Sequence, residues 1–144
     1  MAPRTLLIAS CAFGGRLDAE RVAGAVARGL QAGGWPSELC PLEDCGTGTD
    51  ALRAQLEDLN FDRRMRAAHA VIVCEAKLRE STLAGSPAFE IATRARQAGV
   101  PAYAVTSEDR LDSFDARILD LQRIFQAGDM RTLSRAGRKL AEIV

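Results

Sequence analysis

Short apolar runs alternate with longer amphipathic stretches along the chain. The clearest runs, residues 5–9 and 70–73, show no polar alternation, which is typical of strands buried on both faces of a sheet. Further strands are predicted at residues 37–42, at 100–105 and, as a weaker pattern, at 123–125. Strands that alternate with helices indicate parallel pairing, with helices covering both faces of the sheet.

The amphipathic stretches carry signals for where each helix begins and ends. Asp18 precedes apolar residues at four-residue spacing, and Gly33-Gly34 follows them. Ser86-Pro87 predicts a cap followed by proline at the first helical position, and that helix should end at Gly99. The sequence therefore predicts a single α/β domain over 1–144, a Rossmann-like or flavodoxin-like three-layer fold with a mostly parallel sheet of about five strands.

Four further helices are predicted from weaker signals. Thr49 is expected to cap a helix with a leucine stripe, and Asp62 a shorter helix after it. A brief helix should start at Ser113, and a last helix near Met130. The apolar positions of that last helix are Leu133, Leu140 and Ile143.

Composition limits the classes of partner. The 144 residues are 47% hydrophobic and 26% charged, and 19 basic residues balance 19 acidic ones. A net charge of zero predicts neither a nucleic acid nor an anionic membrane as partner. The apolar runs are too short to span a bilayer, and the opening residues fit a first strand better than a signal peptide. We therefore expect a cytoplasmic protein.

Four cysteines offer a second kind of chemistry: Cys11, Cys40, Cys45 and Cys74. All but Cys40 come just after predicted strands, so their positions meet at one edge of the sheet. With Asp44, Glu75 or His69 they could form a zinc or redox site. However, no CxxC pair is present, and the favoured interpretation is free thiols that fill space as small hydrophobes.

Residues 41–50, PLEDCGTGTD, place two glycines just before a predicted helix. Such a loop lets backbone N–H groups reach a phosphate. A tight turn with Thr49 as the cap explains the same residues without a ligand, and both interpretations stay open. A helix N-terminus facing a phosphate and an ordinary cap are likewise alternatives at Gly85-Ser86-Pro87. His69 is expected at the surface away from the strand ends, and Trp35 in packing at a turn.

Three motifs in the right order resemble the bacterial glycerate kinase family of the glycerate 2-kinase type. IASCAFGGRLDAERVAGAVARGL is similar to the family pattern IAPDSFKGSLSAxEVAxAIxxGL, and PLEDCGTGT to PxADGGEGT. AHAVIVCEAKLRESTLAGSPAF resembles ADLVITGEGRLDxQTLxGKAPxG, and the last strand and helix also follow the family. The resemblance covers nearly the whole chain. The family's large middle section, which helps to enclose the substrate, has no counterpart here.

Most charged residues of the family motifs are replaced. Cys11 stands where the family has an aspartate, Gly14 and Ser86 where it has lysines, and Arg79 where it has a second aspartate. Phosphoryl transfer depends on positioned charge and on exclusion of water, so efficient glycerate kinase activity is not expected. Lys77, near Arg79, could replace a lost lysine only from a different position, and a displaced lysine loses much of its effect on the phosphoryl group.

The resulting hypothesis is a catalytically impaired glycerate-kinase-like domain that binds a nucleotide, phosphate or small organic acid at the carboxyl ends of the strands. No catalytic residue and no metal ligand is assigned, while Mg²⁺ and ATP or ADP would be cofactors if the family activity persists. Alternatives are an active ATP-dependent glycerate kinase or related phosphotransferase, and a homodimeric interaction module without ligand. The ligand-binding residues implied by the resemblance are Cys11, Phe13, Gly14, Gly15, Asp44, Gly46, Gly48, Thr49, Glu75, Lys77, Thr82, Gly85 and Ser86.

Overall fold

A five-stranded parallel sheet forms the centre of the protein in a computed structural model that describes residues 4–43, 45, 48–79 and 85–144. The strands lie in the order β2-β1-β3-β5-β7, and every neighbouring pair is parallel. Their bounds are β1 (Leu6–Ser10), β2 (Ser37–Pro41), β3 (Ala70–Cys74), β5 (Ala102–Thr106) and β7 (Ile124–Gln126). The predicted flavodoxin-like α/β fold is thereby confirmed, because five sequential strands in this order define that arrangement.

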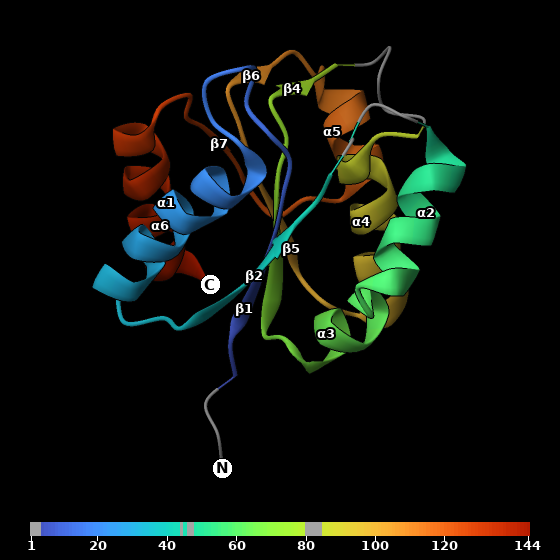
Figure 1. The fold of residues 1–144 in the computed structure, drawn as a ribbon, viewed down its shortest axis with the longest axis horizontal. Helices are drawn as coiled ribbons and strands as arrows, with labels where there is room; N and C mark the ends of the chain where they lie inside the picture. Colours follow the sequence, from blue (N-terminus) through green and yellow to red (C-terminus); the bar gives the residue numbers. More distant parts are fainter. Residues whose placement is uncertain (1–3, 44, 46–47, 80–84) are drawn as a thin grey trace.

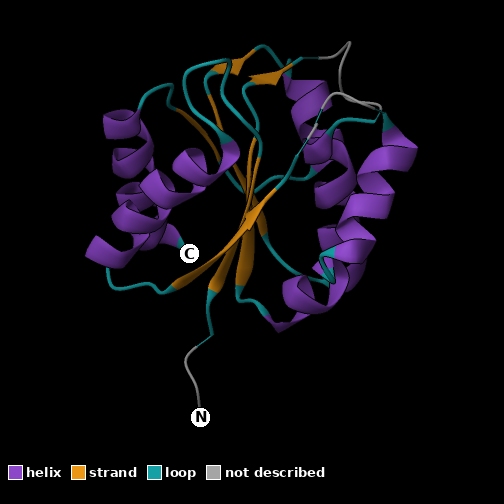
Figure 2. Ribbon diagram, viewed as in Figure 1, coloured by secondary structure: helices purple, strands orange, loops and turns teal. Residues whose placement is uncertain are grey.

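Helices cover both faces of the sheet, as Figures 1 and 2 show. One face carries α1 (Ala19–Ala32) and α6 (Met130–Ile143). The other carries α2 (Thr49–Asp58), α3 (Phe61–Ala67), α4 (Pro87–Ala98) and α5 (Ser113–Leu119). None of the helices in the described ranges is both long enough and apolar enough to cross a membrane.

Two short strands that the sequence does not predict lie over the carboxyl edge of the sheet. β4 (Lys77–Leu78) and β6 (Glu108–Asp109) pair in parallel and sit at the top of Figure 1. Two-residue strands carry no apolar pattern, so periodicity cannot reveal them. They follow β3 and β5 in the chain and pair with each other beyond the ends of those strands.

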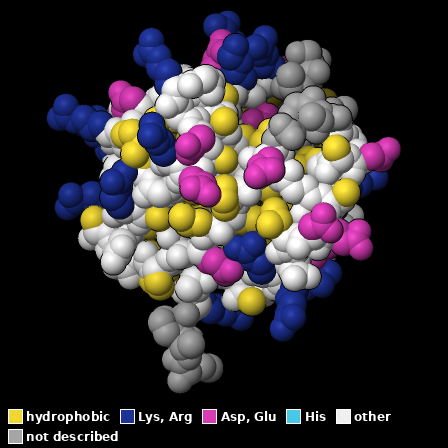
Figure 3. Space-filling model, in the orientation of Figure 1, with side chains coloured by type: hydrophobic (Ala, Val, Ile, Leu, Met, Phe, Trp, Pro, Cys, Tyr) yellow, Lys and Arg dark blue, Asp and Glu magenta, His cyan; other side chains and the backbone are white. Residues whose placement is uncertain are grey.

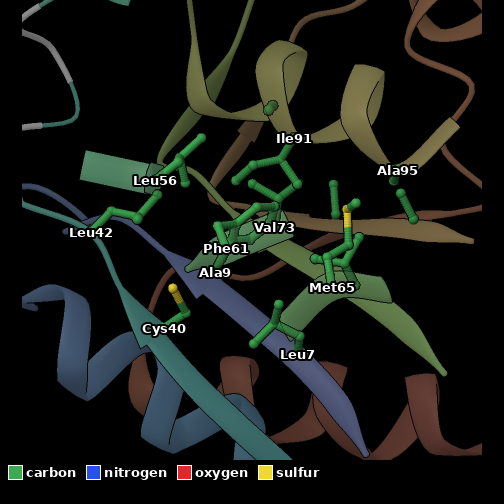
Figure 4. Close-up of a cluster of buried hydrophobic side chains, with 14 of the residues drawn as sticks. Leu7, Ala9, Cys40, Leu42, Leu56, Phe61, Met65, Val73, Ile91 and Ala95 are labelled. Carbon is green, nitrogen blue, oxygen red and sulfur yellow. The ribbon is translucent and has the colours of Figure 1, made fainter. Parts of the chain in front are cut away.

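The strand side chains alternate between two apolar clusters, one on each face. Leu7 and Ala9 of β1 join Val73 of β3 on the α2–α4 face, where Phe61 and Met65 of α3 complete the packing (Figure 4). The alternate residues of the same strands, together with α1 and α6, form the second cluster. Every residue of β1, β3 and β5 is buried, as the unbroken apolar runs predict.

Most predicted helix ends are confirmed. Asp18 accepts a hydrogen bond from the N–H of Arg21 at the start of α1, and α4 starts after Ser86 and stops at Gly99. Two predicted caps are wrong, because Gly48 and Asn60 occupy the cap positions of α2 and α3. Thr49 and Asp62 therefore lie one and two residues inside helices they were expected to cap. The predicted apolar position Ile143 is also wrong, since 40% of it is exposed.

Candidate functional site

The topology puts the switch in strand order between β1 and β3. The chain leaves β1 toward β2 on one side and later returns to β3 on the other, so the connections diverge here. Ligands of open α/β sheets bind outside the carboxyl ends of the strands at such a point. The loops that follow β1, β2 and β3 are those that carry the three motifs.

The first loop closes on itself. The N–H of Phe13 donates to the carbonyl of Leu17 at 2.8 Å, and the Phe13 ring is buried in the α1–α6 cluster. Gly14 has a φ of +66° and, with Gly15, lies exposed at the tip of the turn. The Ser10 hydroxyl donates to the carbonyl of Ala19 at 2.7 Å and fixes the start of α1 against β1.

A cavity of about 540 Å³ lies between the carboxyl end of β2 and the start of α1. Its charged side chains are Asp18, Glu20 and Glu43, and none of the described residues that line it is basic. The side of the molecule seen in Figure 3 has acidic side chains near its centre and most of its basic side chains toward the periphery. Because three carboxylates repel a phosphate or a carboxylate, this cavity does not suit an anionic ligand.

The second loop is tied to the first by a disulfide bond. Cys11, just after β1, is bonded to Cys45, with 6.1 Å between the two Cα atoms. The interpretation of these two cysteines as free thiols is therefore wrong. The two loops that the resemblance implies as ligand-binding are therefore joined covalently.

The other two cysteines are free and buried, as predicted for space-filling thiols. Ser10 and Cys74 are register partners and point toward the same face, so Cys11 points away from Cys74. Burial raises the pKa of the Cys74 thiol to about 12. The zinc alternative fails for this trio, and within the described ranges no three metal-ligating side chains come together.

The loop after β3 contributes the Glu75 carboxylate to the N-terminus of α4. Glu75 accepts a hydrogen bond from the N–H of Ala88 at 2.9 Å, and the Ser86 hydroxyl accepts one from the N–H of Phe89 at 3.1 Å. Pro87 has no N–H to offer. The groups at the N-terminus of α4 that would hold a phosphate are thus engaged within the protein, which favours the cap over the phosphate-binding interpretation.

The start of α2 differs from the starts of α1 and α4. Its cap residue is Gly48, with a φ of +109°, and no side chain among the described residues caps it by a hydrogen bond. Gly85 lies beside Thr49, since a Cβ on Gly85 would come within 2.7 Å of the Thr49 hydroxyl oxygen. Residues from the second and third motifs therefore meet here, at a helix N-terminus that no described side chain caps.

The remaining residues implied by the resemblance are dispersed or outside the described residues. Lys77 is exposed in β4, where the backbone pairs with β6. Asp44, Gly46 and Thr82 lie outside the described residues. His69 stacks on Trp35 with ring centroids 4.8 Å apart at the opposite end of the sheet, as their predicted roles away from the crevice require.

No pattern in the sequence indicates that Glu75 has a perturbed pKa. Burial raises the pKa of this carboxyl from 4.5 to about 7, although the hydrogen bond from Ala88 acts in the opposite direction. A group with a raised pKa in the folded state stabilises the fold below its unfolded pKa, and this stability is lost as pH rises. The affected window runs from about pH 4.5 to about pH 7.

We expect Glu75→Gln to become more stable than the wild type as pH rises through that window. The glutamine keeps an oxygen for the N–H of Ala88 but carries no charge to bury. The difference in the free energy of unfolding should grow to about 1–2 kcal/mol above pH 7, less than the full shift implies because the side chain is only half-buried. Urea unfolding at pH 4.5, 6 and 8 measures it.

Glu142→Gln is the matched control, since Glu142 is exposed near the end of α6. Its curve should follow that of the wild type at each pH. If the free energies of unfolding of Glu75→Gln and the wild type differ by the same amount at pH 4.5 and pH 8, burial of the charged Glu75 carboxylate is not the cause of the difference.

Comparison with known proteins supports the fold. No protein-family model and no curated protein matches the sequence. Among solved structures, a flavodoxin from the domain Archaea is 11% identical, with 96% of each chain covered and a TM-score of 0.53. The NAD(P)H:quinone oxidoreductase from Methanothermobacter marburgensis is 16% identical over 96% of this chain and 100% of its own, also at 0.53.

A pilus assembly-related protein from Burkholderia pseudomallei K96243 is likewise similar. It is 21% identical over 96% of this chain and 90% of its own, with a TM-score of 0.53. Identities this low show the architecture and nothing finer. Together with the strand order, they place the chain in the class of flavodoxin-like α/β proteins.

Proposed function

We propose that the protein is a non-catalytic binding domain, of the glycerate kinase type, that takes a small anion at the N-terminus of α2. The anion would be a phosphate group or a carboxylate of a small metabolite. The observation that carries the proposal is the open start of α2, where Gly48 provides no side-chain cap and Thr49 and Gly85 lie together. The N–H groups of a first helical turn and the helix dipole both favour negative charge at such a position.

The alternatives at the same edge are less suitable for an anion. Asp18 occupies the start of α1, while Glu75 and Ser86 occupy the start of α4. The adjoining cavity is lined by carboxylates. Asp112 and Asp129 likewise occupy the starts of α5 and α6. Among the described helix starts at this edge, that of α2 therefore remains for an anion.

The absence of catalysis follows from what stands at the aligned positions. Cys11 is part of a disulfide, Gly14 has no side chain, and the Ser86 hydroxyl accepts a backbone hydrogen bond. None of these groups supplies the positive charge or the metal ligation that a moving phosphoryl group requires. A coupled assay with ATP, Mg²⁺ and glycerate should show no turnover above a protein-free blank. Measurable turnover would favour the active kinase instead.

Thermal unfolding with inorganic phosphate, glycerate, ADP and ATP tests binding directly. A ligand at 100 times its Kd stabilises the folded state by about 2.7 kcal/mol, so the melting temperature should rise with at least one of these compounds. Thr49→Val should weaken that shift, because the hydroxyl beside the open helix start is lost. Thr93→Val is the matched control, since the Thr93 hydroxyl donates to the carbonyl of Phe89 within α4. No shift with any of the four compounds would remove the proposal.

A homodimer is the second candidate, and it is favoured by one surface. Phe114 and Ile118 lie four residues apart on α5 and are 68% and 42% exposed. A second copy that packs on this helix face would cover both side chains. Sedimentation velocity over a wide concentration range tests it, and Phe114→Asn should abolish any dimer. A monomer throughout would exclude it.

A further inference from the structure

We propose that Cys11 and Cys45 form a reversible dithiol–disulfide couple that reacts with small thiols and disulfides of the glutathione class. The bond joins two residues that lie outside every helix and strand. Its formation or cleavage therefore needs no element of the fold to be taken apart. This redox modification does not depend on the anion site proposed above.

The two sulfur atoms differ in access. Cys11 is only 3% exposed and packs in the apolar cluster beneath α2 and α4, whereas Cys45 is half-buried at the margin of that cluster. A small thiolate can approach Cys45 from solvent but cannot approach Cys11. Cys45 is thus the residue at which an incoming thiol attacks, and Cys11 is the residue that resolves the mixed disulfide.

Both thiols also have a place in the reduced state. The Cys45 Sγ lies 3.9 Å from the carbonyl oxygen of Leu42, so the free S–H can donate to it. Cys11 is held by its backbone, because its N–H donates to the carbonyl of Cys74 at 2.8 Å. Its thiol then sits among apolar side chains, where free cysteine is well tolerated. Both thiols therefore have a favourable environment in the reduced protein.

The exchange balances in two steps. A small thiolate attacks the Cys45 sulfur, forms a mixed disulfide with it and releases the Cys11 thiolate, which takes a proton from water. A second thiolate attacks the sulfur of the small molecule in that mixed disulfide, releases Cys45 as a thiolate and leaves the oxidised small disulfide. Two electrons pass from two small thiols to the protein, and the reverse sequence oxidises it.

Cys40 and Cys74 should take no part. Both are buried, and burial raises the pKa of each thiol, so their thiolate fraction at neutral pH is low. They serve as internal controls, because they become reactive only when the chain unfolds.

The test is alkylation of the native, full-length chain in glutathione buffers of graded oxidised-to-reduced ratio, read by intact mass and peptide mapping. Two thiols, at Cys11 and Cys45, should appear and disappear reversibly while the far-ultraviolet circular dichroism stays native. In Cys11→Ser, Cys45 should take up one glutathione under native conditions. In Cys45→Ser, Cys11 should react at least about tenfold more slowly.

Three results would overturn the proposal. One is a bond that opens only at denaturant concentrations that unfold the chain, which would make it purely structural. Another is a wild-type chain with four free thiols even in oxidised glutathione. The third is equal or reversed reactivity of Cys45 and Cys11 in the two variants. The wild-type titration decides the matter even if either serine variant does not fold.

Discussion

Replacement of Gly137 by alanine is expected to destabilise the protein by about 3 kcal/mol. Helix α6 crosses α1 at this residue, and a Cβ on Gly137 would overlap the carbonyl oxygen of Val26 and lie 3.1 Å from the backbone nitrogen of Leu30. Backbone atoms cannot rotate away as a side chain can, so the helices must separate and the cluster behind them must open. Alanine's better helix propensity, worth about 1 kcal/mol, offsets only part of this cost.

Gly29 on the facing helix should behave in the same way. Its added Cβ would overlap the carbonyl oxygen of Ser134 and lie 2.7 Å from the backbone nitrogen of Arg138. The two substitutions act on one interface, so the double variant should lose less than the sum of the single losses. Urea unfolding measures each loss, and for a chain of this size the melting temperature of Gly137→Ala should fall by roughly 6–12 °C.

Gly24→Ala is the control and should have the opposite sign. Gly24 also lies inside α1, but nothing lies within 4 Å of a Cβ added there. With no clash, only the helix propensity remains, and the variant should gain about 0.5–1 kcal/mol. Stabilisation of all three alanine variants would contradict the close backbone contact between α1 and α6.

The fold follows from the sequence because its signals are local. The apolar runs mark strands buried on both faces, and Asp18, Ser86 and Gly99 mark helix ends, all where the structure has them. The caps at Thr49 and Asp62 fail for a physical reason. At both places the backbone enters the helix through a positive φ, at Gly48 and at Asn60, and no side chain is needed to turn the chain.

The candidate site was less predictable because it depends on which face each side chain takes. Cys11, Cys45 and Cys74 look equivalent in the sequence, as each follows a strand. Only the register of β1 against β3 places Cys74 on the opposite face and leaves the other two together. The pKa of Glu75 has the same origin, since burial beside the start of α4 is a tertiary effect. The motif resemblance carries no information about these contacts.

Residues that the resemblance implies as ligand-binding are engaged in contacts within the fold. Glu75 accepts a hydrogen bond from the N–H of Ala88 at the start of α4, and Cys11 is bonded to Cys45. Gly48 and Gly85 both adopt a positive φ. A group engaged in this way cannot also stabilise a transition state without giving up its contact, so stability and catalysis would compete for the same edge of the sheet.

Loss of the disulfide is expected to have the largest effect on stability. The bond closes a loop with a sequence separation of 34 residues. Loop-closure entropy for that length corresponds to about 3–4 kcal/mol, which acts mainly by restricting the unfolded chain. Cys45→Ala should therefore unfold at lower urea concentration than the oxidised wild type by that free energy, and the wild type in reductant should show nearly the same loss.

The comparison under reducing conditions separates the bond from the side chain. If restriction of the unfolded chain is the cause, Cys45→Ala and wild type should agree within about 0.5 kcal/mol once both are reduced, since a half-buried thiol at a loop contributes little packing. Cys40→Ala provides the contrast: Cys40 is buried in the α2–α4 cluster and forms no disulfide, so its loss should be the same with or without reductant. A Cys45→Ala deficit that persists in full under reduction would place the stabilisation in contacts of the folded state rather than in the cross-link.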